Sequence, residues 1–395
     1  MDFLNPAEVN PIATYHVMNT DSSVADPSRG PPDVTDEQVI EWYKNMVTVS
    51  IMDSIMFEAQ RHGRLSFYMV SAGEEAVMIG SAAALSPKDV ITCQYRETGV
   101  FLQRGFGLKD FMSQLTANHN DPGKGRNMPV HYSGKNKVNI HAVASTLATQ
   151  IPHATGAAYA LKMDALENPD QPGNVAVAYF GEGAASEGDF HAALNVAAVR
   201  ECPVIFICRN NGFAISTPTS EQYIGDGVAV RGMSYGIESI RVDGTDIFAV
   251  YEATREARRK ALEKGGRPIL LEFMSYRVSH HSTSDDSFAY RDRSDVEAWK
   301  ALNDPPSRLR LWMEKKALWD EEKEKEFRST TRSAVLRELF AAEKEKKPAL
   351  RGIFDDVYAE LTEEAKEQKE DLRRLMMKYP EEYDVNDHVE GIQGL

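Results

Sequence analysis

Cysteine is scarce in this sequence of 395 residues. The three cysteines, Cys93, Cys202 and Cys208, are too few and too scattered for a disulfide framework or a zinc site. Two of them lie in or beside apolar stretches that have the character of buried strands. We therefore expect three reduced thiols in the protein interior.

Basic charge and long apolar runs are also in short supply. Lys and Arg number 45 against 60 Asp and Glu, so the formal net charge is −15. Nucleic-acid binding needs a concentrated basic face, and no nucleic-acid partner is expected. No apolar run approaches the roughly 20 residues that a membrane-spanning helix needs, so no membrane partner is expected either. With 42% hydrophobic and 27% charged residues, the composition is that of an ordinary globular protein.

The N-terminal segment has few basic residues and no helical pattern. Its first arginine is Arg29, and Asp2 and Glu8 precede it, so it resembles neither a signal peptide nor a basic transit peptide. Five of the eighteen prolines fall within residues 1–34, namely Pro6, Pro11, Pro27, Pro31 and Pro32. We expect residues 1–34 to form an extended arm that lies on a partner.

The most informative stretch runs from Asn174 to Gly212. An apolar run over residues 175–180 leads into a glycine turn, a helical pattern follows to about residue 200, and a second apolar run covers residues 204–208. This order predicts a βαβ unit with two parallel strands that are buried on both faces. The turn Gly181-Glu182-Gly183 and the pair Asn210-Asn211 then lie at the carboxyl ends of the strands, where ligands bind in open α/β sheets.

These strand ends suit a metal diphosphate. Backbone N–H groups at a helix N-terminus favour a phosphate, while the Glu182 carboxylate and the Asn211 carbonyl are oxygen ligands that Mg²⁺ prefers. A Gly-acid-Gly turn followed after 26 residues by Asn-Asn has the spacing of the thiamine diphosphate signature, with Glu182 where most families have Asp. A dinucleotide-binding turn would need a third glycine where Ser186 stands. A purely structural glycine turn remains an alternative at this point.

The surrounding sequence predicts a mainly parallel sheet flanked by helices, in an α/β fold. Expected strands cover residues 90–93, 239–242 and 268–276, and expected helices cover 35–63, 147–163 and 247–264, the first opened by a capping box at Thr35. From residue 295 onward the chain reads as charged helices. We expect an arm over residues 1–34, an α/β domain over 35–294 and a helical region over 295–395.

Two polar segments bear on the site. Arg96 follows the strand over residues 90–93, a position that suits phosphate binding, with a surface salt bridge as the alternative. The run from Arg277 to Asp286 is expected to be a mobile loop at the active-site edge of the sheet. A basic glycine loop over residues 121–126 lacks the Lys-Ser/Thr ending of a nucleotide P-loop.

Three motifs together resemble the α subunits of the branched-chain 2-oxoacid dehydrogenases, which are thiamine diphosphate-dependent decarboxylating enzymes. The motifs are residues 181–189, residues 214–219, and residues 280–286 with Tyr290-Arg291. The similarity covers nearly all of the chain from about residue 35. It implies the thiamine diphosphate-binding fold.

The resemblance also implies a set of site residues. Mg²⁺ would be held by Glu182, Asn211 and the main-chain carbonyl of Phe213, where the family usually has Tyr. His281 would be catalytic, and Leu147 would hold the cofactor in its bent shape. A potassium ion would be held by Ser145, Thr149 and Gln150, although Ala144 stands where the family usually has a serine. The implied cofactor-binding residues are Gln94, Tyr95, Arg96, Leu147, Gly181, Gly183, Ala184, Arg209 and His281.

The implied activity is oxidative decarboxylation of branched-chain 2-oxo acids, with transfer of the acyl group to a lipoyl carrier. In this family a glutamate that activates the cofactor lies in a β subunit, so a heterotetramer of two α and two β subunits is implied. Further implied partners are a lipoyl-bearing acyltransferase core and a regulatory kinase and phosphatase. The kinase would act on Ser282, and Asp292 replaces the second serine that the family often modifies.

The compartment implied is the mitochondrial matrix, with the bacterial cytoplasm as the alternative. Three other functions stay open from the sequence. The chain could be a pyruvate dehydrogenase α subunit, a non-catalytic scaffold relative, or a nicotinamide-dependent oxidoreductase.

Overall fold

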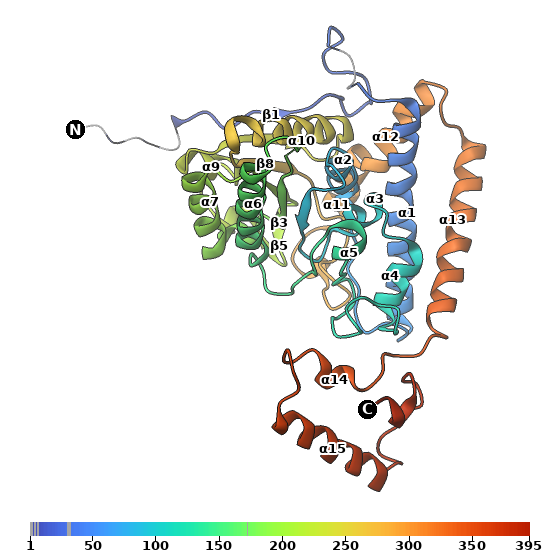
Figure 1. The fold of residues 1–395 in the computed structure, drawn as a ribbon. Coiled ribbons are helices and arrows are strands. Elements are labelled where there is room, and N and C mark those ends of the chain that lie inside the picture. The colour runs from blue at the N-terminus through green and yellow to red at the C-terminus, as the bar shows by residue number, and fades with distance from the viewer. Residues whose placement is uncertain (1–2, 4, 6–7, 30–32, 172) are drawn as a thin grey trace.

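The fold is built on one parallel sheet of six strands in the order β1-β7-β8-β4-β3-β2 (Figure 1). The structure is a computed structural model that describes residues 3, 5, 8–29, 33–171 and 173–395. The predicted α/β class with a mainly parallel sheet is confirmed. The strands are β1 (Thr14–Tyr15), β2 (Val90–Thr92), β3 (Ala176–Gly181), β4 (Val204–Asn210), β7 (Glu238–Asp243) and β8 (Ile269–Met274).

The sheet is covered by helices on both faces, which explains why its central strands are apolar throughout. All seven residues of β4 are buried. On one face, Val177 and Ile205 pack with α1 (Asp36–Arg61), α2 (Glu75–Ala83) and α10 (Ile247–Ala261). On the other, Ala178 and Phe206 pack with α6 (Gln150–Glu167) and α7 (Gly188–Arg200). Successive side chains of a strand point to opposite faces, so each strand contributes to both cores.

The βαβ unit predicted around the glycine turn is present, with one difference. β3 and β4 pair in parallel, and Gly181 lies opposite Arg209. The expected helix from residue 185 is instead a 3-10 turn over Ala184–Ser186 followed by α7, because Glu187 adopts an extended backbone conformation between them. The turn that precedes α7 is therefore longer than the sequence pattern indicated.

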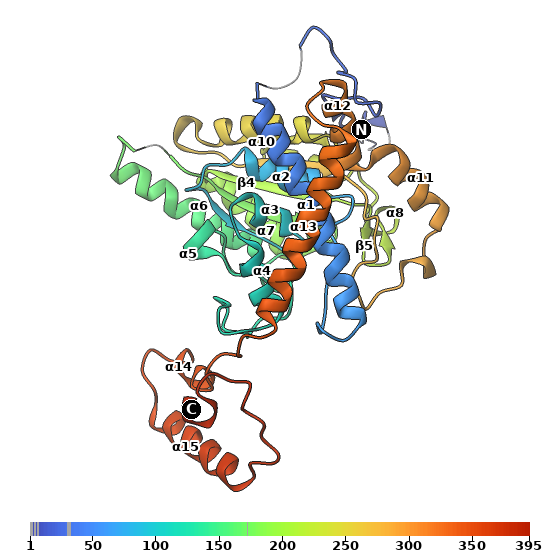
Figure 2. The same cartoon turned by 90° about the vertical axis from the view of Figure 1, so that its right-hand side faces the viewer.

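The first long helix begins as predicted. Thr35 accepts a hydrogen bond from the backbone of Gln38, and the Gln38 side chain accepts one from the backbone of Thr35, which completes the capping box of α1. The apolar stripe of α1 is buried against α2, α12 (Pro305–Lys315) and α13 (Glu321–Ala342). Figure 1 shows α13 beside α1, and in Figure 2 the two helices cross.

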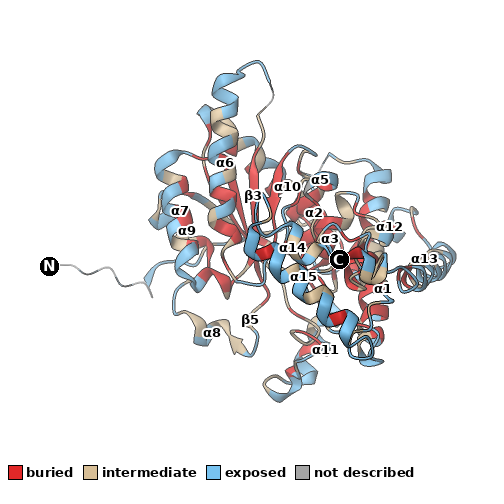
Figure 3. Ribbon diagram, turned by 60° about the horizontal axis from the view of Figure 1, so that its bottom comes forward, coloured by how far each residue is buried: buried red, intermediate tan, exposed pale blue. Residues whose placement is uncertain are grey.

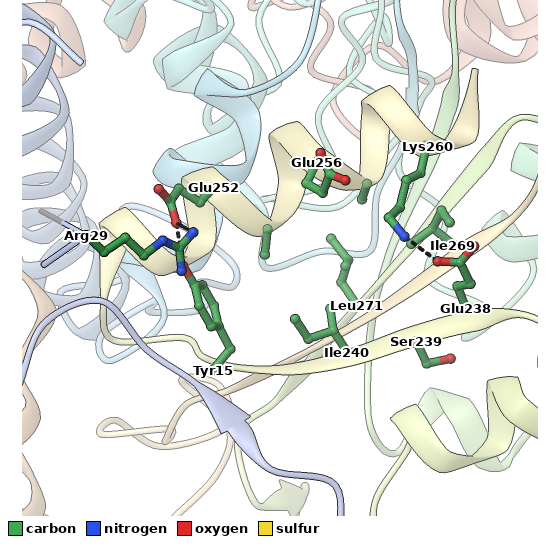
Figure 4. Close-up of a pocket in the computed structure, with 12 residues that line it drawn as sticks. Tyr15, Arg29, Glu238, Ser239, Ile240, Glu252, Glu256, Lys260, Ile269 and Leu271 are labelled. Carbon is green, nitrogen blue, oxygen red and sulfur yellow. Dashed lines mark hydrogen bonds and ion pairs between the residues drawn. The ribbon is translucent and has the colours of Figure 1, made fainter. Parts of the chain in front are cut away.

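From residue 12 to 18 the N-terminal arm lies on the sheet of its own chain, a contact that the sequence did not predict, and the expected contact of the arm with a partner stays a prediction. β1 extends the sheet by pairing with β7, and the backbone N–H groups of Val17 and Met18 donate to the Asp246 carboxylate. The Tyr15 hydroxyl and the Arg29 guanidinium of the same arm both donate hydrogen bonds to the Glu252 carboxylate on α10, beside a cavity of about 380 Å³ (Figure 4). The parts of the arm at residues 1–2, 4, 6–7 and 30–32 lie outside the described residues.

The C-terminal region is helical and charged, as predicted. It contains α11 (Arg293–Asn303), α12, α13, α14 (Gly352–Asp355) and α15 (Glu363–Lys378). Many residues of these helices are exposed to solvent (Figure 3). The last part forms its own small core around Leu350, Met376 and Leu395 and lies apart from the sheet in Figures 1 and 2. Asp356 connects it to the main body through ion pairs with Lys124 and Arg126.

The remaining short helices and strands are α3 (Thr98–Gln103), α4 (Leu108–Leu115), α5 (Lys135–Val138), β5 (Phe213–Ala214), β6 (Thr217–Pro218), α8 (Thr219–Gln222) and α9 (Ala229–Ser234).

In the described residues, no helix combines the length and the apolar character that crossing a membrane would require.

Candidate active site

A cavity of about 230 Å³ lies at the carboxyl ends of β2, β3 and β4. The structure brings to it every residue predicted to bind the cofactor or Mg²⁺: Gln94, Tyr95, Arg96, Leu147, Gly181, Glu182, Gly183, Ala184, Arg209, Asn211, Phe213 and His281. These residues come from segments far apart in the sequence. They meet because parallel strands all present their carboxyl ends at the same edge of the sheet.

The glycine turn allows a close approach of two backbone segments. A Cβ atom on Gly183 would lie 2.7 Å from the Cβ of Ala214, which is closer than real Cβ contacts, so a larger residue would displace the segment at β5. Gly212, which follows Asn211, has a φ of +87°, a conformation that glycine adopts without strain. The Gln94 side chain accepts the N–H of Gly181 at 3.1 Å and ties the end of β3 to the segment after β2.

Glu182 is the residue whose environment points most directly to a metal ion. Its side chain is 2% exposed, and its Oε2 atom accepts the backbone N–H of Asn211 at 3.3 Å. Its Oε1 atom is buried and has no hydrogen-bond partner among the residues that the structure describes. Burial, together with the nearby Glu74 carboxylate, raises the pKa of Glu182 to about 7. A buried carboxylate oxygen without a partner is costly, and a hard cation would satisfy it.

The other predicted metal ligands are positioned beside it. The Asn211 Oδ1 atom accepts the N–H of Phe213 at 3.2 Å, so the amide oxygen lies on the side of Phe213. Within the described parts of the chain, no cluster of three or more His, Cys, Asp or Glu residues could hold a metal ion. One carboxylate, one amide and one carbonyl suit Mg²⁺, which commonly completes its coordination with phosphate oxygens and water. The residues present therefore fit a metal diphosphate.

Two arginines supply positive charge to the cavity. Arg209 is held between two buried carboxylates, with its Nε atom 2.6 Å from Glu97 and its Nη1 atom in contact with Glu74. Arg96 donates to the carbonyl groups of Val70 and His281, and its Nε atom lies 3.6 Å from Glu74. At 2% exposure, Arg96 is not part of a surface salt bridge, so that alternative is wrong.

Two residues of this network were missed by sequence reasoning. Glu74 and Glu97 belong to no motif, and a glutamate near a helix start is ordinary in any globular protein. Only the fold shows that both reach Arg209. Arg277 was predicted only as the first residue of the loop at the active-site edge; it lines the cavity, and its buried Nε and Nη1 atoms have no hydrogen-bond partner among the described residues.

His281 faces Tyr95 across the cavity. Its Nε2 atom lies 3.3 Å from the Tyr95 hydroxyl, and the two rings meet edge to face at 6.0 Å. Burial lowers the pKa of His281 to about 3, and the positive charges of Arg96 and Arg277 contribute. The imidazole is therefore neutral at physiological pH, and such a ring can both donate and accept a hydrogen bond.

The segment that carries His281 makes hydrogen bonds within itself that the sequence did not predict, and its mobility stays a prediction. Asp285 accepts the backbone N–H of His281 and the hydroxyl of Tyr290, each at 2.7 Å. Tyr290 in turn accepts from Arg277 at 2.6 Å. Arg291 donates to three carbonyl groups in the segment over residues 277–279. This network, and not solvation alone, accounts for the polar composition of the loop.

Two further predictions stay predictions. Ser282 is 7% exposed and its Oγ atom accepts the N–H of Ser284, so a modifying enzyme could reach it only after the loop opens. The residues predicted to hold potassium each have a partner in the chain: Ser145 with His131, Thr149 with the Thr146 carbonyl and Gln150 with the Tyr179 carbonyl.

Comparison with known proteins supports a single family. Residues 43–351 match the family described as the dehydrogenase E1 component. A protein of Mus musculus named 2-oxoisovalerate dehydrogenase subunit alpha, mitochondrial, is 49% identical over 390 residues, which cover 99% of this chain and 86% of the mouse protein. The Homo sapiens protein of the same name is 48% identical, covering 99% of this chain and 85% of its own. An Arabidopsis thaliana protein, subunit alpha 2 of the same enzyme, is 49% identical, covering 97% and 79%.

Proposed function

The chain belongs to the dehydrogenase E1 component family, and on that premise we propose that it is the α subunit of a branched-chain 2-oxoacid dehydrogenase. It decarboxylates branched-chain 2-oxo acids and passes the acyl group to a lipoyl carrier. The observation that carries the proposal is the unpartnered, buried Oε1 atom of Glu182 in a cavity lined by Arg96, Arg209 and His281. A non-catalytic scaffold would have no need of such a costly arrangement.

The cofactor is thiamine diphosphate, which when bound supplies an electron sink for the decarboxylation and a carrier for the acyl group. Glu182, Asn211 and the Phe213 carbonyl would hold Mg²⁺. Leu147, half-buried at the cavity wall, would pack against the cofactor and limit its shape. The diphosphate would contact the side chains of Gln94, Tyr95, Arg96, Arg209 and His281 and the backbone at Gly181, Gly183 and Ala184.

His281 is the residue of this chain to which we assign the catalytic role. Its ring is neutral at physiological pH, so one nitrogen can donate a hydrogen bond and the other can accept one. The Tyr95 hydroxyl contacts Nε2 and fixes the orientation of the ring. The backbone N–H of His281 is held by Asp285, so the loop network controls where the imidazole lies.

The enzyme works with a second type of chain, as the name "subunit alpha" states for the relatives. We infer a heterotetramer with two β subunits, each contributing the glutamate that activates the cofactor. A lipoyl-bearing acyltransferase core would accept the acyl group. Because the relatives are named mitochondrial, we assign the chain to the mitochondrial matrix in preference to a bacterial cytoplasm.

Regulation and a second cation belong to the same proposal. A kinase would phosphorylate Ser282 next to His281, and a phosphatase would reverse the modification. A phosphate adds about −1.5 to −2 charges beside the proposed diphosphate and would disfavour the ordered loop. A potassium ion near Ser145, Thr149 and Gln150 would require these side chains to exchange their present partners.

Decarboxylation assays of the chain with and without its β subunit test this function. We expect activity only in the assembled enzyme, and a higher kcat/KM for 4-methyl-2-oxopentanoate and 3-methyl-2-oxobutanoate than for pyruvate. An apolar pocket gains roughly 1–3 kcal/mol for each methylene that it buries. A tenfold preference for pyruvate would replace this assignment with a pyruvate dehydrogenase α subunit. No activity in any combination would favour a scaffold.

A further inference from the structure

Glu74 is a fully buried carboxylate that contacts two residues lining the candidate site, Arg209 and Asn211, and none of the functions assigned above uses it. We propose that Glu74 is a positioning residue that makes the site bind a diphosphate only together with its metal ion. The inference rests on the proposed function, since the guest is taken to be magnesium thiamine diphosphate.

The contacts of Glu74 all lead to predicted ligands of that guest. Its Oε1 atom accepts the Asn211 Nδ2 amide at 3.0 Å, and its Oε2 atom contacts the Nη1 atom of Arg209. The Arg96 Nε atom lies 3.6 Å from Oε1. Glu74 immediately precedes α2, but its side chain makes no capping hydrogen bond. Its carboxylate thus serves the segments after β2 and β4 and not its own helix.

The contact with Asn211 determines which way that amide points. A carboxylate oxygen accepts hydrogen bonds, so it requires the NH₂ group of Asn211 to face Glu74. The amide oxygen is then directed away from Glu74, where it accepts the Phe213 N–H at 3.2 Å. Phe213 is the other proposed ligand that lies next to Asn211. Glu74 therefore turns the oxygen of Asn211 toward the metal position.

The charges around the cavity lead to the same conclusion. Three buried arginines, Arg96, Arg209 and Arg277, line the cavity together with the buried Glu182, and two further buried glutamates, Glu74 and Glu97, form ion pairs with Arg209 behind it. A metal-free diphosphate would bring several negative charges next to carboxylates whose positive partners are already engaged. Bound Mg²⁺ would offset two of those charges. The balance favours the metal complex over the free diphosphate, and Glu74 is the acid that touches both arginine and metal ligand.

The adjacent residue provides a matched control. Glu75 is as deeply buried as Glu74, at 2% exposure, but it accepts hydrogen bonds from Ser50 and from the N–H of Gly73. Within the described residues, no hydrogen bond or ion pair joins Glu75 to a residue that lines the cavity, whereas Glu74 contacts Arg209 and Asn211. Glu74→Gln and Glu75→Gln each replace one buried acid by its amide, at neighbouring positions, with the same change of volume.

The test is calorimetric titration of thiamine diphosphate into the enzyme assembled with its β subunit, with saturating Mg²⁺ and with EDTA. The dissociation constant in EDTA divided by the dissociation constant in Mg²⁺ is the factor by which the metal strengthens binding, and this factor is the ratio compared between variants. We expect Glu74→Gln to lower this ratio about tenfold, because metal-free binding strengthens while binding with metal weakens. Glu75→Gln should keep the ratio of the unmodified enzyme.

The outcomes separate this inference from the proposed function. If Glu74→Gln weakens both titrations by the same factor, Glu74 has only a structural role and the inference is overturned. If the unmodified assembled enzyme binds no thiamine diphosphate under either condition, the proposed function itself fails. Should Glu74→Gln not assemble, Glu74→Asp keeps the charge but shortens the side chain that reaches Asn211, and an unchanged ratio in that variant would also overturn the inference.

Discussion

Replacement of Glu75 by glutamine should change how the stability of the protein depends on pH. Burial raises the pKa of Glu75 from 4.5 to about 8, and the nearby Asp304 carboxylate adds to the rise. The folded state therefore holds a proton that the unfolded chain releases at lower pH. The stability linked to this proton is fully present below pH 4.5 and is lost as the pH rises through about 8.

The size of the effect follows from the shift. From 4.5 to about 8, the shift corresponds to at most about 5 kcal/mol, gained or lost at about 1.4 kcal/mol per pH unit within that range. Glutamine carries no charge at any of these pH values. It keeps an acceptor for the Gly73 N–H, and the Ser50 hydroxyl can turn to the Met46 carbonyl, which lies 3.1 Å away.

The assay is thermal or urea unfolding of the unmodified protein and of Glu75→Gln at pH 5, 7 and 9. Glu75→Gln should lose less stability than the unmodified protein between pH 5 and pH 9, and the difference between the two should grow toward high pH. Asp53, whose pKa burial raises to about 7, contributes a slope of the same sign to both proteins, so the assay compares the two slopes and not the slope of either protein alone. Parallel pH profiles for the two proteins would refute the reasoning.

Three other predictions concern the site. Glu182→Ala and Asn211→Ala should each abolish retention of thiamine diphosphate, because each removes an oxygen from the proposed metal, and unchanged affinity by calorimetry in both would rule out the metal assignment. Asp285→Asn should weaken the contacts to His281 and Tyr290. A protease should then cleave the loop faster, and acyl transfer to a lipoyl substrate should slow about tenfold. A cleavage rate equal to that of the unmodified enzyme would contradict this prediction. Ser282→Ala should keep near-normal transfer, whereas Ser282→Glu should lose most of it and be cleaved faster near residue 282, and equal activity of the two would leave the loop without a regulatory role.

The residues that the sequence predicted well are those whose position follows from the topology of a parallel sheet. Once β3 and β4 are recognised as neighbours, Glu182 and Asn211 must lie at the same edge, however many residues separate them. Arg96 follows for the same reason, since β2 pairs with β3. The periodicity of the chain fixes these relations before any side-chain contact is known.

Other features depend on contacts that no local pattern records. Glu74 becomes part of the site only because α2 starts beside the end of β4, and its neighbour Glu75 has an equally ordinary sequence context. The arm offered only prolines as a signal, and its pairing with β7 rests on backbone groups and on Asp246. The loop around His281 looked solvated because its residues are polar, whereas those same residues bond to one another in the folded protein.

The central claim is that the cavity at the carboxyl ends of β2, β3 and β4 holds a metal diphosphate through Glu182 and Asn211. Crystals of the enzyme assembled with its β subunit and grown with thiamine diphosphate and Mn²⁺ test it directly, because manganese gives an anomalous signal. We expect a single strong peak within about 2.3 Å of the Oε1 atom of Glu182 and of the Asn211 amide oxygen, with the diphosphate beside Arg209. A peak elsewhere in the protein, or a bound cofactor whose metal leaves Glu182 Oε1 without a ligand contact, would contradict the account.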